Sequence, residues 1–194
     1  MINLSLKGDP LKKLAKALED SPKEIGKRTE RALNKTAAKH KTQISKKVRE
    51  IITAKAAAVK DVIEVEKALS PHKLSAVIHI SQTKRLGLIQ FKHRLTKKGV
   101  VYKIEKTGTQ ELIKGAFKIE SKGGHIFRRK NKYNPDQTRK YNRATTAPLR
   151  GTTVYNVFTK HKLERWSKKT VRKELAFQVD QQIKNYLKYK LKKK

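Results

Sequence analysis

The chain has 194 residues and a mass of 22.3 kDa, and its 50 Lys and Arg against 16 Asp and Glu leave a formal net charge of +34. It contains no cysteine, which excludes disulfide frameworks, thiol catalysis and thiolate metal sites. No apolar run approaches the roughly 18 residues that span a bilayer. The first seven residues also lack the apolar stretch of a secretory signal. We therefore expect no membrane partner.

The positive charge is unevenly distributed along the chain. Residues 67–160 hold 22 basic and 4 acidic side chains, a balance of +18, whereas residues 1–66 and 161–194 carry +7 and +9. Such a charge opposes compaction through self-repulsion, so we expect an anionic neighbour. Charge alone allows nucleic acid, an acidic protein surface or a membrane face, of which we do not expect the membrane. The 38 Lys outnumber the 12 Arg, a bias that an AT-rich coding sequence also produces.

The N-terminal third has the periodicity of helices. After Pro10, apolar residues recur every three or four positions through 11–18 and predict a short amphipathic helix. A longer helix is expected to begin at Ser21-Pro22, because Ser21 can cap it and Pro22 suits a first turn. Its apolar stripe continues to about residue 52, which predicts roughly 30 helical residues with a basic opposite face.

A break is expected near Thr53, which we predict to cap a short helix over 54–61. Beyond residue 62 the apolar period changes to two, and runs bounded by Gly and Pro predict short strands. Residues 86–91 are apolar but fit either a strand or a loop. Four to six strands in an antiparallel sheet are expected, and the clearest runs are 62–68, 74–80, 100–104, 116–119 and 125–128.

The last third predicts a loop and then a helix. Residues 129–151 lack periodicity and predict a long loop. A helix of about 25 residues is expected to start near 167–170 and to end in the lysines at 192–194. Helices, then strands, then a helix indicate the α+β class. We expect an α+β domain over 1–160, with 161–194 forming a basic helix that packs on this domain or on a neighbouring subunit.

Residues with catalytic chemistry are sparse. The basic middle region offers the acids Glu105, Glu111, Glu120 and Asp136, and no group of them resembles the converging carboxylates of a two-metal nuclease. The six histidines lack metal-site spacing, and His40 on the apolar helical stripe is expected to be packed and hydrogen-bonded. Phosphate-binding glycine motifs are absent. We expect no enzyme, no catalytic or metal-binding residue and no cofactor; a nuclease is the weakest alternative.

The most concentrated basic segment is 121–151, in which two tyrosines are interleaved. Its side chains fit either phosphates, in salt-dependent binding without sequence readout, or a protein neighbour that orders the loop. The candidate contact residues are Lys122, Arg128, Arg129, Lys130, Lys132, Arg139, Lys140, Arg143 and Arg150. The basic face of the long helix is expected to be solvated; it carries Lys27, Arg31, Lys35, Lys39, Lys46 and Arg49.

Three groups of short motifs resemble the bacteriophage minor tail protein Z family, the lambda-type tail completion proteins. The first is Arg31-Ala32-Leu33-Asn34-Lys35-Thr36-Ala37 on the long basic helix. The second is Leu86-Gly87-Leu88-Ile89-Gln90-Phe91, followed by Lys98-Gly99-Val100. The third is Gly115-Ala116-Phe117, Gly124-His125-Ile126-Phe127-Arg128-Arg129 and Ala147-Pro148-Leu149-Arg150-Gly151-Thr152-Thr153-Val154.

The resemblance spans about residues 25–158, with Thr152-Thr153 where the family has proline and serine. It implies a structural virion protein that completes the head-proximal end of a long-tailed phage tail and supports head–tail joining. The implied partners are the tail terminator, the tail tube and the head–tail connector, in a virion assembled in the host bacterial cytoplasm. Since tail tubes are six-fold symmetric, a homo-oligomeric ring of six copies is expected. The alternative is a sequence-independent DNA-binding protein that recognises the phosphate backbone.

Overall fold

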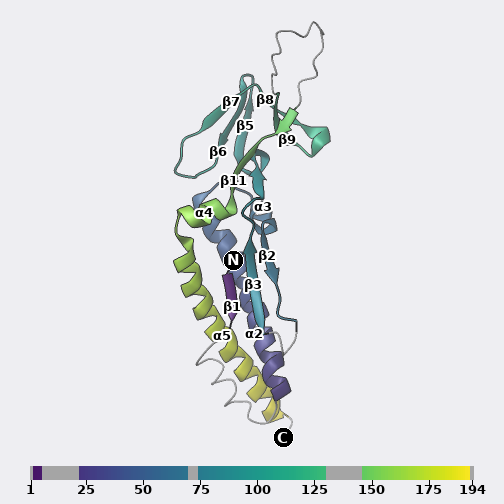
Figure 1. Cartoon of the computed structure of the whole chain (residues 1–194), viewed down its shortest axis with the longest axis vertical. Helices are drawn as coiled ribbons and strands as arrows, with labels where there is room; N and C mark the ends of the chain where they lie inside the picture. Colours follow the sequence, from purple (N-terminus) through teal and green to yellow (C-terminus); the bar gives the residue numbers. More distant parts are fainter. Residues whose placement is uncertain (1, 6–21, 70–73, 130–145, 193–194) are drawn as a thin grey trace.

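The protein is an elongated α+β molecule (Figure 1). Two long helices and a three-stranded sheet lie along one part, and the other small sheets cluster beyond them. A computed structural model describes residues 2–5, 22–69, 74–129 and 146–192. The helix expected over 11–18, the cap at Ser21 and residues 130–145 of the expected loop lie outside the described residues. The fold class, with its long N- and C-terminal helices, is confirmed.

The long N-terminal helix is α2, Pro22–Ile51, and its length agrees with the sequence prediction. Its apolar stripe forms the centre of the molecule, because Leu33, Ile44 and Val48 are fully buried in the main core. A three-stranded antiparallel sheet packs against α2. This sheet has the order β1-β3-β2 and consists of β1 (Ile2–Ser5), β2 (Ile63–Glu66) and β3 (Ser75–Ile80).

The break after α2 forms differently from the prediction. The short helix α3 covers Ala56–Asp61, and the residue before it, Lys55, provides no side-chain cap. Thr53 was therefore wrongly predicted as the cap. Its hydroxyl instead donates to the carbonyl oxygen of Lys103 and accepts the backbone N–H of Lys92 at 3.1 Å. Thr53 thus ties the end of α2 to a pair of distant strands.

The middle of the chain forms three further small sheets in place of one sheet of four to six strands. The first has the order β5-β6-β7, the second β10-β9-β8 and the third pairs β11 with β4. These strands are β4 (Arg85–Gly87), β5 (Lys92–Thr96), β6 (Gly99–Lys103), β7 (Glu111–Lys114), β8 (Ala116–Ile119), β9 (His125–Arg129), β10 (Thr146–Pro148) and β11 (Arg150–Thr153). Two single 3-10 turns, η1 (Leu88–Gln90) and η2 (Glu120–Lys122), interrupt them.

The prediction of a structureless loop over 129–151 was wrong at both ends. Arg129 belongs to β9, and the later residues return as β10 and β11. Pairing explains the return: β10 is hydrogen-bonded to β9, and β11 to β4. The described ends of this segment are thereby fixed beside two other strands.

The C-terminal helix α5, Leu163–Lys192, is longer than predicted and begins earlier. It follows a short helix, α4 (Val154–Lys160), that the sequence analysis missed; Thr153 caps α4 by accepting the N–H of Asn156 at 3.0 Å. α5 runs antiparallel beside α2 (Figure 1), and Val171 and Leu175 join the main core. None of the helices in the described residues is long and apolar enough to cross a membrane.

Candidate functional site

The predicted contact residues fall into two groups. Lys130, Lys132, Arg139, Lys140 and Arg143 lie outside the described residues. The other four occupy defined positions in the fold: Lys122 ends η2, Arg128 and Arg129 end β9, and Arg150 begins β11.

Arg128 marks the point at which β9 emerges from the core. Ile126 and Phe127 are buried, whereas the side chain of Arg128 is exposed. Arg150 is also exposed and pairs with Gly87 across the short β4–β11 ladder. The fold thus holds the first and last arginines of the predicted surface on paired strands, with solvent-facing side chains.

A cavity of about 460 Å³ lies between β6, the turn that follows it, and α4. It brings together Glu105 and Glu111. The Lys160 ammonium donates to Glu105 at 2.7 Å, and this hydrogen bond lowers the pKa of the Glu105 carboxyl. The Tyr102 hydroxyl donates to Glu111, which raises the pKa of Tyr102 to about 12. Both carboxylates are engaged by side chains of the same chain.

Glu120, another acid considered for a nuclease, does not line this cavity. Glu120 pairs with Lys118 at 2.5 Å, and Asp136 lies outside the described residues. Among the residues that the structure describes, no group of three or more His, Asp or Glu is arranged to hold a metal ion. The described geometry therefore offers no support for a two-metal mechanism, which needs converging carboxylates.

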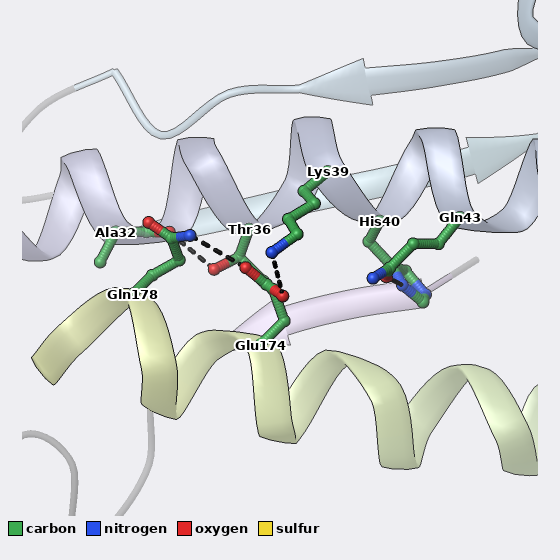
Figure 2. Close-up of polar contacts among 7 residues, drawn as sticks. All are labelled: Ala32, Thr36, Lys39, His40, Gln43, Glu174 and Gln178. Atoms are coloured by element: carbon green, nitrogen blue, oxygen red, sulfur yellow. Dashed lines mark hydrogen bonds and ion pairs between the residues drawn. The ribbon is translucent and has the colours of Figure 1, made fainter. Parts of the chain in front are cut away.

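A polar cluster joins α2 to α5 (Figure 2). The Lys39 ammonium lies 2.8 Å from Glu174, whose other carboxylate oxygen accepts the Gln178 amide N–H at 2.9 Å. Burial alone would raise the pKa of Glu174, but the hydrogen bonds from Lys39 and Gln178 outweigh it and hold that pKa below its usual value. The Lys39 ammonium also lies 5.4 Å from the ring centroid of Phe177. These contacts fix the register of the two helices.

His40 is a packed, hydrogen-bonded residue, as the sequence predicts. Its Nε2 lies 2.8 Å from the Ser167 hydroxyl and its Nδ1 lies 3.2 Å from the Gln43 amide oxygen. The ring stacks on Trp166 with centroids 5.9 Å apart. Burial lowers the pKa of His40, so the imidazole is neutral near pH 7. It serves the helix interface.

The basic face of α2 is solvent-exposed at every one of its six predicted positions, which confirms the solvated-face interpretation. Lys39 alone among these six has a recorded ion-pair partner, the Glu174 carboxylate of α5. The remaining five contribute to the positive electrostatic potential of the molecule as a whole.

The sequence analysis missed the strands β5 and β7 and with them the basic side chains that they carry. The available signal was the alternation of Lys92 and Arg94 with His93 and Leu95, next to a hairpin turn at Lys97-Lys98-Gly99. Comparisons with protein-family models, with curated proteins and with solved structures find no match to this chain.

Proposed function

We propose that this protein is a structural component of the virion of a long-tailed bacteriophage, where it completes the head-proximal end of the tail and supports joining to the head. In this proposal it acts without catalysis, as a homo-oligomeric ring of six copies between tail terminator, tail tube and head–tail connector. The basis is the ordered set of motifs that resembles the minor tail protein Z family, together with a charge of +34 suited to a position beside DNA.

The observation that carries the proposal is the meeting of motif segments that are distant in sequence. Gly87 pairs with Arg150. The Leu88 N–H donates to the carbonyl oxygen of Leu149 at 3.1 Å, and the Leu149 N–H donates to that of Ile126 at 2.8 Å. Segments of the second and third motif groups are thus hydrogen-bonded neighbours. This contact supports reading them as one structural unit, as the resemblance requires.

Two motif glycines have steric reasons to be glycine. A Cβ at Gly151 would lie 2.7 Å from the ring of Phe91, a residue of the second motif group. Gly99 has φ +146° and faces the carbonyl oxygen of Ile113, 2.1 Å from the position of a Cβ. These requirements support a shared fold behind the motif resemblance.

The direct test is deletion of the gene from the phage genome that carries it, with complementation from a plasmid. We expect separate heads and tails, or particles that fail to inject, in electron micrographs and plaque assays. Complementation with the intact gene restores plaques. A matched complementing variant, Lys35→Gln on the solvated face of α2, is expected to restore them as well.

Wild-type infectivity of the deletion mutant would contradict the proposal. So would a genomic neighbourhood without genes for the tail tube, the tail terminator and the tape measure. Native mass spectrometry of the neck or of the purified protein tests the ring separately, with six copies of the 22.3 kDa chain as the expected result.

A second candidate function is sequence-independent binding to the DNA backbone, which the +18 balance of residues 67–160 favours. It predicts tight duplex binding by the isolated protein with a steep salt dependence. Replacement of the arginines and lysines over 128–150 by Glu tests the predicted surface. Unchanged binding after these replacements would argue against that surface.

A further inference from the structure

The sheet β5-β6-β7 carries cations on one face. Side chains alternate between the two faces of a strand, and Val100 of β6 is fully buried, so its neighbour Val101 belongs to the outward face. Val101 is paired with Arg94 of β5 and with Leu112 of β7. The same parity places four cations on this outward face: Lys92, Arg94, Lys103 and Lys114.

These four cations have no acidic ion-pair partner among the residues that the structure describes. Each ion pair recorded among the described residues involves other basic side chains. The acid of β7, Glu111, has the opposite parity from Lys114 and accepts the Tyr102 hydroxyl instead. Lys92 and Lys103 are direct cross-strand partners. Since like charges opposite each other destabilise a sheet, a bound anion would relieve this repulsion.

Three of the four cations line a hollow of about 240 Å³ over β5 and β6. Its lining residues are Lys92, His93, Arg94, Val101, Tyr102, Lys103 and Gln110. Neighbouring strands lie about 4.8 Å apart, and residues two apart in one strand lie about 6.6 Å apart. The Cα positions of Lys92, Arg94 and Lys103 are therefore close enough for the three side chains to contact one tetrahedral anion. The Gln110 amide offers a further donor.

We propose that this sheet face binds the phosphate backbone of double-stranded nucleic acid. Lys92, Arg94 and Lys103 hold one phosphate, and Lys114 at the far edge of the sheet meets another. A duplex fits better than a single strand, because the outward positions of β5, β6 and β7 carry no aromatic ring for base stacking. Tyr102 also lines the hollow, but it has the opposite parity and its hydroxyl donates to Glu111. An acidic protein fits less well, because the centre of this face is Val101 and Leu112 rather than the large anchors of protein interfaces.

Binding of this kind reads no sequence, because the contacts go to phosphates. The inference rests on the second candidate function, for which it names a surface different from the predicted one at 122–150. It is independent of the tail-completion proposal, whose test is the deletion mutant.

The test compares two variants of the full-length protein that each lose four positive charges. One is K92Q/R94Q/K103Q/K114Q on the sheet face; the matched control is K27Q/R31Q/K35Q/K46Q on exposed positions of α2. Affinity for a labelled random-sequence duplex is measured by fluorescence anisotropy at several NaCl concentrations. We expect the sheet variant to lose affinity. Its log–log salt slope should become less steep by about 1.8, which is about 0.9 for each of the two phosphates that the sheet face contacts.

The control variant is expected to retain most of the affinity and the wild-type salt slope. Equal losses in both variants would overturn the proposal, because they would reflect the overall field alone. Tighter binding of the sheet face to polyglutamate than to duplex would assign it to an acidic protein and overturn it too. Absence of duplex binding by the wild type would overturn both this inference and the second candidate function.

Folding of both variants is checked by circular dichroism and thermal unfolding. The backbone N–H of Lys92 still donates to Thr53 in the sheet variant, and the loss of the opposed Lys92–Lys103 charges favours the sheet. A double variant, R94Q/K103Q, provides a milder second measurement. An unchanged affinity for the duplex in a folded double variant would also overturn the proposal.

Discussion

At Gly151 the backbone of β11 passes against the buried ring of Phe91, and a Cβ there would lie 2.7 Å from the ring. We expect Gly151→Ala to lower the free energy of unfolding by about 1–3 kcal/mol, since a closely packed core accommodates an added methyl only by shifting its neighbours. Urea unfolding followed by circular dichroism measures the loss.

The matched control is Gly87→Ala, in the partner strand of the same ladder. A Cβ at Gly87 would have its nearest neighbour at 3.6 Å, an ordinary van der Waals contact. This variant should therefore remain within about 0.5 kcal/mol of the wild type. Equal unfolding midpoints for the two variants would show that the Phe91 ring moves aside freely.

His40 gives the protein a pH-dependent stability. Burial lowers the pKa of His40 from the ordinary value of 6.5. Below pH 6.5, His40 is therefore protonated in the unfolded chain while it stays neutral in the folded chain. We expect the free energy of unfolding to fall as the pH drops from 6.5, with a slope of at most about 1.4 kcal/mol per pH unit. The decline ends at the pKa of the folded state.

The groups that face His40 also affect how the free energy of unfolding depends on pH. The Glu174 carboxylate favours the protonated imidazole and limits the fall of the His40 pKa. The pKa of Glu174 is itself held below its ordinary value of 4.5, so a second loss of stability begins only below that pH. The comparison is His40→Gln, which should flatten the slope between pH 6.5 and 4.5. An equal slope in the variant would assign the titration to another group.

At the scale of elements, a partly exposed ion pair links α2 to α5 beside their buried contacts. Lys39 is half exposed, but its partner Glu174 has a side chain only 10 % exposed. We expect Lys39→Met to cost about 1 kcal/mol, because the carboxylate loses its charged donor and water replaces it only in part. Lys35→Met, on the exposed face of the same helix, should cost less than about 0.5 kcal/mol.

A double-mutant cycle separates this coupling from general effects. Adding Glu174→Gln to Lys39→Met should recover part of the lost stability, since the uncompensated carboxylate is removed. Thermal unfolding of the four proteins provides the free energies. Purely additive effects would mean that the two side chains act independently, and that other contacts join the helices.

The elements that the sequence predicted are those whose apolar face is continuous. The apolar stripe that includes Leu33, Ile44 and Val48 is the face of α2 that is buried. Its periodicity predicts the bounds of α2 almost to the residue. β5 was missed because Leu95 is 52 % exposed, so the apolar residue in this strand does not mark the core. Thr53 was misjudged because its partners lie about 40 and 50 residues away, and local pattern carries no information about them.

The candidate site also has one part that local sequence pattern predicts and one part that depends on contacts between distant residues. Arg128 and Arg150 are exposed, as basic side chains usually are, and their contact with a partner stays a prediction. The sheet face with Lys92 and Lys103 required cross-strand register, which a sequence pattern alone does not provide. The number of basic residues can be counted in the sequence. Their clustering on one face depends on which strands pair and in which register, and this requires the structure.

At the scale of the whole molecule, 34 uncompensated positive charges oppose the folded state through mutual repulsion. The ion pairs recorded in the described part are mostly exposed, and pairs of this kind contribute about 0–1 kcal/mol each. Repulsion among the basic side chains should therefore outweigh the attraction within ion pairs. Because salt screens both, its net effect should be to relieve the repulsion. We expect the unfolding temperature to rise as NaCl increases from 0.01 M to 0.15 M, over which the Debye length falls from about 30 Å to about 8 Å.

Differential scanning fluorimetry at constant pH measures this salt response. The sheet variant K92Q/R94Q/K103Q/K114Q provides an internal comparison, because it removes the directly opposed Lys92 and Lys103. Its unfolding temperature at low salt should exceed that of the wild type, and its further rise with NaCl should be smaller. A wild-type unfolding temperature that falls with added NaCl would mean that attractive pairs dominate the fold, and that an anionic neighbour is not needed to offset the charge.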